Sequence, residues 1–222
     1  MKFKSSEFDL SVSGRTAHAY LSVPEGGGPG ILVLHAWWGL NPFFKQVCDR
    51  LAAGGFTALA PDLLQGHTAK TIAQAEALLQ LQQDDPDLLQ EIVQAGLSHL
   101  ASITAGSLGV MGFSMGAYWS MVAAASDSRV KAVALFYGTS DVDPAKIGAA
   151  VQGHFAENDP YESPEGVRGM EDAMKASGVD AGFYTYAGTS HWFMEDDRPE
   201  YDSRAAAAAW ERTTAFLKQT LG

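Results

Sequence analysis

The pentapeptide Gly112-Phe113-Ser114-Met115-Gly116 holds a serine between two glycines in the pattern G-x-S-x-G. A short apolar run, 107–111, precedes it, and a run of good helix formers, 117–125, follows it. This order predicts a strand, a sharp turn and a helix, with the central serine in a strained backbone conformation. The turn would present the serine hydroxyl at the carboxyl end of a buried strand. An ordinary Gly-Ser turn has the same pattern, so residues elsewhere in the chain must show whether this serine is a nucleophile.

A serine hydroxyl is a weak nucleophile, and it needs a general base that is itself oriented by an acid. Asp159 follows an apolar run at 149–155, and His191 follows a second run at 182–186. The order serine, acid, histidine, with each residue in a loop after a strand, is typical of α/β-hydrolases. We therefore predict a catalytic triad of Ser114, Asp159 and His191.

Two other acids could orient the histidine: Glu157 in the same loop, and Asp141 after the preceding strand. The remaining histidines form no metal motif such as H-E-x-x-H; they are His18, His35, His67, His99 and His154. His35 ends an expected strand, and we expect it to hold loop backbone rather than carry protons. The sequence therefore predicts no metal and no cofactor.

Hydrolysis through a tetrahedral intermediate needs two backbone N–H groups that face the developing oxyanion. Met115 is predicted to supply one, because it follows the nucleophile at the start of a helix. Trp37, in the loop after the apolar run 31–34, is predicted to supply the other. The same loop, the helix behind it and the His191 segment predict a substrate pocket, with some members in the ordinary core; its residues are Ala36, Trp38, Phe43, Trp192 and Phe193.

The elements that must position these residues follow from the hydrophobic pattern. Alternation in 7–12 and 16–23, around Ser13-Gly14-Arg15, predicts a β-hairpin. Buried strands are expected at 31–34, 56–60, 107–111, 130–137, 149–155 and 182–186. Helices are expected at 42–53, 68–83, 86–100, 117–125, 165–177 and 199–221, with Asn41 as a cap and a capped restart at 84–86. The alternation predicts one α/β domain over 1–222, with a mostly parallel sheet covered by helices on both faces.

Composition excludes several functions. The formal net charge of −11, without a basic stripe, argues against nucleic acid as a partner. The single cysteine, Cys48, can form no internal disulfide, and no apolar run reaches membrane-spanning length. Since the first residues also lack the apolar core of a signal peptide, we expect a soluble cytoplasmic protein. Its expected partner is a small-molecule ester or lactone, and the chain is expected to act as a monomer or homodimer.

With these residues in place, the chain resembles the dienelactone hydrolase family of α/β-hydrolases. The resemblance covers nearly the whole chain and rests on the segments 35–41, 60–63, 112–116, 153–159 and 188–193. It implies a compact, largely lidless domain that hydrolyses small esters or lactones through an acyl-enzyme. The family's triad positions fall on Ser114, Asp159 and His191, and its oxyanion donors fall on Trp37 and Met115.

The chain departs from dienelactone hydrolase itself at several positions. That enzyme has a cysteine nucleophile and a glutamate that controls the thiol's protonation, whereas this chain has Ser114 and Ala36. The two changes agree, because a serine with a histidine base has no thiolate to manage. The arginines that hold the dienelactone carboxylate align with Gly66 and Glu195. An anionic lactone would then meet no cation and one like charge, so we expect an uncharged, small to medium ester.

The leading hypothesis from the sequence is a serine carboxylesterase or lactonase. A second hypothesis keeps the same residues but directs them at thioester, amide or organophosphate bonds. A third is a catalytically silent binding protein that retains the hydrolase fold.

Overall fold

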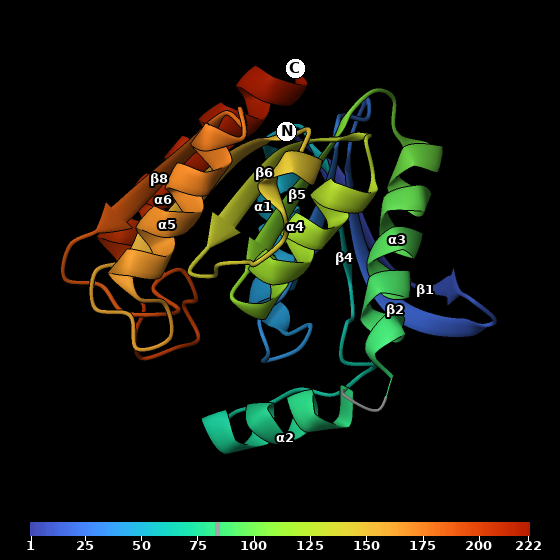
Figure 1. Cartoon of the computed structure of the whole chain (residues 1–222). Helices are drawn as coiled ribbons and strands as arrows, with labels where there is room; N and C mark the ends of the chain where they lie inside the picture. Colours follow the sequence, from blue (N-terminus) through green and yellow to red (C-terminus); the bar gives the residue numbers. More distant parts are fainter. Residues whose placement is uncertain (83–84) are drawn as a thin grey trace. The chain divides into compact units, whose positions relative to one another are not determined.

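Residues 1–82 and 85–222 are described by the computed structural model of the chain, without the side chains of 81, 82 and 86. The chain divides into two units, Met1–Leu108 and Gly109–Gly222 (Figure 1). The single domain predicted over 1–222 stays a prediction. The predicted helix end at Gln83 and the first residue of the predicted restart, Asp84, lie outside the described residues.

The first unit contains strands in the order β1-β2-β4-β3, of which β1 with β2 and β2 with β4 pair antiparallel, while β3 and β4 are parallel. Its elements are β1 (Phe3–Val12), β2 (Arg15–Pro24), β3 (Gly30–Leu34), α1 (Pro42–Ala53), β4 (Thr57–Pro61), α2 (Ile72–Gln82) and α3 (Pro86–Ile103). Every residue of β3 and β4 is buried. The reason is that α1 and α3 both pack on this part of the sheet, and Figure 1 shows them on opposite faces.

The β1–β2 hairpin closes through the two residues Ser13 and Gly14, because Val12 pairs directly with Arg15. Both turn residues have positive φ, 46° and 83°. A two-residue turn of this kind matches the right-handed twist of paired strands. The predicted hairpin is confirmed, with a connection one residue shorter than expected.

Helix starts in the first unit follow local capping. The side chain of Asn41 accepts the N–H of Phe44 at 3.3 Å, which confirms the predicted start of α1. Helix α2 begins at Ile72, later than the predicted residue 68, and the hydroxyl of Thr71 accepts the N–H of Gln74. The capped restart of α3 is corrected, because Asp85 makes no side-chain cap and its carboxylate is instead paired with Arg15.

The second unit has the strand order β5-β6-β7-β8, in which β6 with β7 and β7 with β8 are parallel. Its elements are β5 (Leu108–Phe113, beginning with the last residue of the first unit), α4 (Met115–Ser126), β6 (Val130–Phe136), the 3₁₀ turn η1 (Pro144–Lys146), β7 (Ala150–Ala156), α5 (Pro164–Ala176), β8 (Ala181–Tyr186) and α6 (Ser203–Leu221). Helices α4 and α6 contact β6, and α5 contacts β8. The pattern did not predict η1, whose three residues are too few to show a period. Among the described helices, none combines the length and hydrophobicity that a membrane span requires.

The start of α6 is also corrected, from the predicted Pro199 to Ser203. The carboxylate of Asp202 accepts the N–H of Ala205 at 2.8 Å, so this aspartate caps the helix. The N–H of Asp202 donates to the carbonyl of Phe193 at 3.0 Å. The cap therefore ties the beginning of α6 to the segment that carries His191.

We expect Asp202→Ala to lower the free energy of unfolding by about 1 kcal/mol, because one helix N–H group loses its acceptor. Urea denaturation of the variant and the wild type measures this difference. Glu211→Ala, at an exposed position inside α6, is the matched control and should change stability little. Equal stability of Asp202→Ala and the control would contradict the cap.

Candidate active site

Ser114 occupies the turn between β5 and α4, with φ at 52° and ψ at −114°. This left-handed conformation is unfavourable for a residue with a side chain and costs on the order of 1–3 kcal/mol. The N–H of Ser114 donates to the carbonyl of Phe136 at 2.9 Å, and its own carbonyl accepts the N–H of Ala117 at 2.8 Å. The turn is therefore held from β6 on one side and from the first turn of α4 on the other.

Two glycines make room for this turn. A Cβ on Gly112 would lie 2.2 Å from the carbonyl oxygen of Gly116 and 2.2 Å from the hydroxyl of Ser120. A Cβ on Gly138, in the loop after β6, would lie 2.6 Å from the carbonyl oxygen of Ser114. The requirement at Gly112 was predicted from the motif, whereas Gly138 was not, because it is far from Ser114 in the sequence.

The side chains of Ser114, His191 and Asp159 form one row of hydrogen bonds. His191 Nε2 lies 2.9 Å from Ser114 Oγ, and His191 Nδ1 lies 2.8 and 2.9 Å from the two carboxylate oxygens of Asp159. The side chains of His191 and Asp159 are almost fully buried. Since Asp159 can only accept at neutral pH, Nδ1 carries the proton and Nε2 faces the serine as an acceptor. The row can therefore move a proton from Ser114 to His191.

Backbone donors hold the acid in place. Asp159 Oδ1 accepts the N–H groups of Tyr161 at 2.9 Å and Glu162 at 3.1 Å. The loop is also joined to the histidine segment, because the N–H of Asn158 donates to the carbonyl of Thr189 at 3.0 Å. A carboxylate that accepts several hydrogen bonds keeps its orientation.

The alternative acids occupy other positions. Glu157 accepts the N–H of Gly188 at 2.8 Å, so it holds the loop that leads to His191 and does not orient the imidazole. Asp141 is exposed in the loop after β6. The hydrogen bonds of His191 select Asp159 from the three candidates.

Aromatic rings surround the imidazole of His191. The ring centroids of Tyr137, Tyr161 and Trp192 lie 5.0, 4.8 and 4.9 Å from that of His191. Trp192 has a positive φ of 66°, and it is 5% exposed. Phe193 has no exposed surface, because it packs between Tyr137 and Tyr186. The pocket roles of Trp192 and Phe193 stay predictions.

The predicted donor Met115 is the first residue of α4, where helix N–H groups lack an intrahelical acceptor. Trp37, the other predicted donor, lies in the first unit, in the turn after β3. Three predicted pocket residues of the first unit, Ala36, Trp38 and Phe43, are buried at 0%, 2% and 4% exposure. The oxyanion and pocket roles of these residues stay predictions.

His35 holds loop backbone, as the sequence predicts. Its Nε2 accepts the N–H of Leu63 at 3.0 Å, so its Nδ1 donates to the carbonyl of Ala36 at 2.7 Å. Both ring nitrogens are thereby used to join the loop after β3 to the segment after β4.

His154 on β7 is also held by structure. Its ring nitrogens bind the hydroxyl of Tyr186 at 2.8 Å and the side chains of Gln152 and Thr213 at 3.0 and 2.9 Å. Burial, together with the nearby charge of Arg212, lowers the pKa of His154 to about 3, so it stays neutral. Among the described residues, no cluster of His, Cys, Asp and Glu side chains is arranged to hold a metal ion.

The sequence predicts that Glu195 carries a negative charge that repels an anionic substrate, and the structure differs from this prediction. Its side chain has no exposed surface, and its Oε1 accepts the hydroxyl of Tyr137 at 2.8 Å. Burial raises the pKa of Glu195 to about 8, so the carboxyl is mostly protonated at neutral pH. The predicted repulsion of an anionic substrate by Glu195 is therefore wrong at that pH. Gly66 has a φ of 87° and open space where a Cβ would point.

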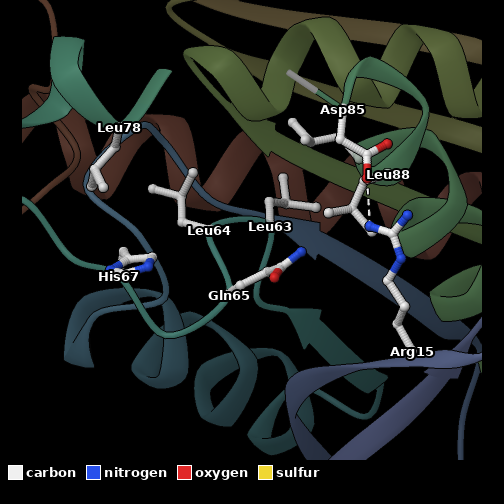
Figure 2. A pocket seen from close by; sticks show the side chains of 9 residues that line it. Arg15, Leu63, Leu64, Gln65, His67, Leu78, Asp85 and Leu88 are labelled. Atoms are coloured by element: carbon white, nitrogen blue, oxygen red, sulfur yellow. Dashed lines mark hydrogen bonds and ion pairs between the residues drawn. The ribbon is translucent and has the colours of Figure 1, made fainter. Parts of the chain in front are cut away.

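The first unit also contains a pocket of about 290 Å³ beside Gly66 (Figure 2). Its residues are Arg15, Leu63, Leu64, Gln65, His67, Leu78, Asp85, Leu88 and Leu89. The leucines give it apolar walls, and the cation Arg15 is neutralised by its ion pair with Asp85, as Figure 2 shows. Such a pocket suits a small uncharged group better than a carboxylate.

Tyr137 and Gly138 were not predicted as members of the site, and Glu195 was predicted there only as a like charge. Tyr137 offered one signal, because it is a polar side chain at the carboxyl end of a buried strand, the edge where ligands gather in such sheets. For Glu195, the alignment with an arginine of dienelactone hydrolase gave its position near the site but not its bond to Tyr137. Its contact with Tyr137 joins residues far apart in the chain, which no local pattern shows.

The chain is similar to known proteins over nearly its whole length. The model of the Dienelactone hydrolase family matches residues 17–221. Protein usf of Aquifex pyrophilus is 32% identical over 225 residues, which cover 96% of this chain and 97% of that protein. A protein of Aquifex aeolicus with the provisional name carboxymethylenebutenolidase is 29% identical over 225 residues, with the same coverage.

Solved structures share the fold. A dienelactone hydrolase-like promiscuous phosphotriesterase from metagenomic libraries has a TM-score of 0.87 and 22% identity, and the match covers 99% of both chains. A cold-adapted esterase from an Arctic intertidal metagenomic library has a TM-score of 0.72 and 18% identity over 100% of this chain and 96% of that chain. At such identity the likeness shows the fold alone, and it confirms the predicted α/β-hydrolase fold with its N-terminal hairpin. The family match over nearly the whole length places this chain in the dienelactone hydrolase family, a family of hydrolytic enzymes.

Proposed function

We propose that this protein is a serine hydrolase that cleaves small to medium, uncharged carboxylic esters or lactones through an acyl-enzyme. The observation that carries the proposal is the row of hydrogen bonds from Asp159 through His191 to Ser114. Because the family is hydrolytic, a nucleophile with a base in reach has a direct use. No metal or organic cofactor takes part in the proposed reaction.

The first half of the reaction forms the acyl-enzyme. His191 Nε2 takes the proton of Ser114 while Oγ forms a bond with the carbonyl carbon of the ester. The carbonyl π electrons move to its oxygen, which the N–H groups of Met115 and Trp37 stabilise in this proposal. The bond to the leaving oxygen then breaks, and His191 gives its proton to the departing alcohol. In a lactone, the leaving oxygen stays attached to the acyl group.

The second half repeats these steps with water. His191 takes a proton from water as the hydroxide oxygen attacks the acyl carbon, and the proton returns to Ser114 Oγ as it leaves. A carboxylic acid is released. Asp159 stays ionised throughout, keeps the proton on Nδ1 and stabilises the imidazolium.

The preference for uncharged substrates rests on the missing cations. Gly66 carries no side chain, and Glu195 is buried with its carboxyl bound to Tyr137. Neither position, therefore, can pair with a substrate carboxylate. The proposed preference for uncharged substrates therefore rests on the lack of a cation that would attract a carboxylate, and not on repulsion by Glu195.

Organophosphate triesters are the second candidate substrate class. The observation that favours them is the shared fold with the dienelactone hydrolase-like promiscuous phosphotriesterase. The same serine would attack phosphorus and expel an aryl oxide. Thioesters, amides and a silent binding role are weaker alternatives, because no described feature favours them over an ester.

We expect Ser114→Ala to reduce hydrolysis of p-nitrophenyl acetate by at least about 1000-fold, because the nucleophile is lost. Release of p-nitrophenol measures the rate, and circular dichroism checks the fold. Ser126→Ala, at an exposed serine of the same helix, is the control. A fluorophosphonate probe should label Ser114 stoichiometrically in the wild type. Unchanged activity in Ser114→Ala, or no labelling, would reject the proposal.

We expect Asp159→Asn to lower kcat about 1000- to 10,000-fold with little change in KM, because the amide favours the wrong tautomer of His191. Steady-state kinetics with p-nitrophenyl acetate measures both constants. Glu157→Gln and Asp141→Asn are the matched controls and should keep near wild-type kcat. A larger loss in either control would give the orienting role to that residue.

We expect a neutral p-nitrophenyl ester to have a kcat/KM about tenfold or more above that of its carboxylate-bearing analogue, because the carboxylate loses water on binding and no cation at these positions compensates for that loss. Mono-p-nitrophenyl glutarate and its ethyl ester form a suitable pair. The measurement is made near pH 7. Faster turnover of the anion would overturn the assignment of Gly66 and Glu195.

A further inference from the structure

A fully buried carboxyl group lies in the same segment as the proposed base His191. Glu195 closes a turn in which its N–H donates to the carbonyl of Trp192 at 2.9 Å, and its carbonyl accepts the N–H of Arg198 at 3.0 Å. Its side chain has no exposed surface. The carboxyl accepts the hydroxyl of Tyr137, which lies 2.8 Å from Oε1. Among the described residues, Oε2 has no hydrogen-bond partner.

Tyr137 connects this carboxyl to both reacting groups. Its ring packs against the imidazole of His191, with centroids 5.0 Å apart. Its own backbone is strained, with φ at 39°, and its N–H donates to the carbonyl of His154 at 2.8 Å. The next residue, Gly138, lies against the backbone of Ser114. The Tyr137 to Glu195 hydrogen bond therefore joins the loop that supports Ser114 to the segment that carries His191.

We propose that Glu195 is a positioning residue that, through Tyr137, fixes the separation between His191 and Ser114. This inference rests on the proposed function, since it concerns the same two groups. Glu195 would touch neither substrate nor the transferred proton. Its contribution would be to keep the imidazole within hydrogen-bond distance of Oγ, where a displacement of ~1 Å can cost up to about 100-fold in rate.

The form of Glu195 that positions His191 is the one with a protonated carboxyl group. Burial is the main cause that raises the pKa of Glu195 from an ordinary value of 4.5 to about 8. The charges of Asp197 and Glu200 raise this pKa further, while the hydrogen bond from Tyr137 and the charge of Arg198 lower it. Tyr137 itself remains a donor, because burial and the charges of Glu195, Asp197 and Asp159 keep its pKa well above 10. His191 is titratable as well, and its imidazole faces the Tyr137 ring.

Loss of this proton should release the histidine segment. An ionised carboxylate with no exposed surface lacks water, and such a charge is too costly to remain buried without a paired cation. We expect the segment around Glu195 to open so that the carboxylate reaches solvent. His191 would then leave its position beside Ser114, and activity would fall as the pH rises through about 8.

The test compares the pH profile of the wild type with that of Glu195→Gln. The amide keeps an acceptor for Tyr137 but cannot ionise. With p-nitrophenyl acetate, both proteins should have similar kcat near pH 7. The wild type should fall about tenfold below the variant at pH 9, because a group with that pKa is then about one tenth protonated. Glu211→Gln, at an exposed acid on α6, is the matched control and should keep the wild-type profile.

Stability gives a readout that does not depend on activity. The folded protein holds the Glu195 proton more tightly than the unfolded chain does. The stability that this proton provides is therefore complete below pH 4.5 and is lost as the pH rises to about 8. Relative to Glu195→Gln, the wild-type unfolding constant should rise by about tenfold per pH unit in this range and then level off. Urea denaturation from pH 5 to pH 9 measures the difference.

Tyr137→Phe isolates the hydrogen bond from the ring packing. We expect kcat to fall by up to about 100-fold at all pH values with little change in KM, because the ring remains but the tie is lost. Tyr118→Phe, at an exposed tyrosine of α4, is the control. Identical pH profiles for the wild type and Glu195→Gln would overturn the inference. If Ser114→Ala stays active, the proposed function fails instead, so the two failures can be told apart.

Discussion

The left-handed backbone at Ser114 is the constraint on which the second unit depends. Its φ of 52° is unfavourable for serine, and the turn persists only because its neighbours leave no better conformation. Gly112 and Gly138 allow the backbone to approach closely from two directions, and the carbonyl of Phe136 accepts the strained residue's N–H. Strands β5 and β6 and helix α4 therefore meet at this point, and the hydroxyl is presented at the strand ends.

His191 lies in a loop, yet its imidazole must be held as firmly as a side chain on a strand. Several anchors act on its segment: the carboxylate of Asp159 binds Nδ1, and the ring of Tyr137 packs on the imidazole. The N–H of Asp202, at the start of α6, donates to the carbonyl of Phe193. Asp159, Tyr137 after β6, and the start of α6 thus each restrict the segment that carries His191. These contacts fix the orientation of the imidazole, as the proposed role of a general base requires.

Glu195 illustrates why residue type alone does not give charge. From the sequence alone, a glutamate aligned with an arginine of dienelactone hydrolase is expected to be an anion that repels a carboxylate. Burial without a paired cation makes the ionised form costly, so the group holds its proton and becomes a hydrogen-bonding part of the scaffold. At this position the chain therefore presents neither a cation nor an exposed anion.

The sequence by itself determined the hydrolase fold, the hairpin, the strands and the candidates Ser114, Asp159 and His191, because these depend on local patterns and chain order. Two helices begin later than the hydrophobic periodicity predicts, because the side chains of Thr71 and Asp202 accept hydrogen bonds from their first turns. The choice of Asp159 over Glu157 needed the tertiary structure, since both acids lie in one loop and only distances separate them. The contact of Tyr137 with Glu195, and the protonation that burial imposes, also appeared only there. Dielectric environment and long-range contacts are properties of the folded chain, and no local sequence pattern encodes them.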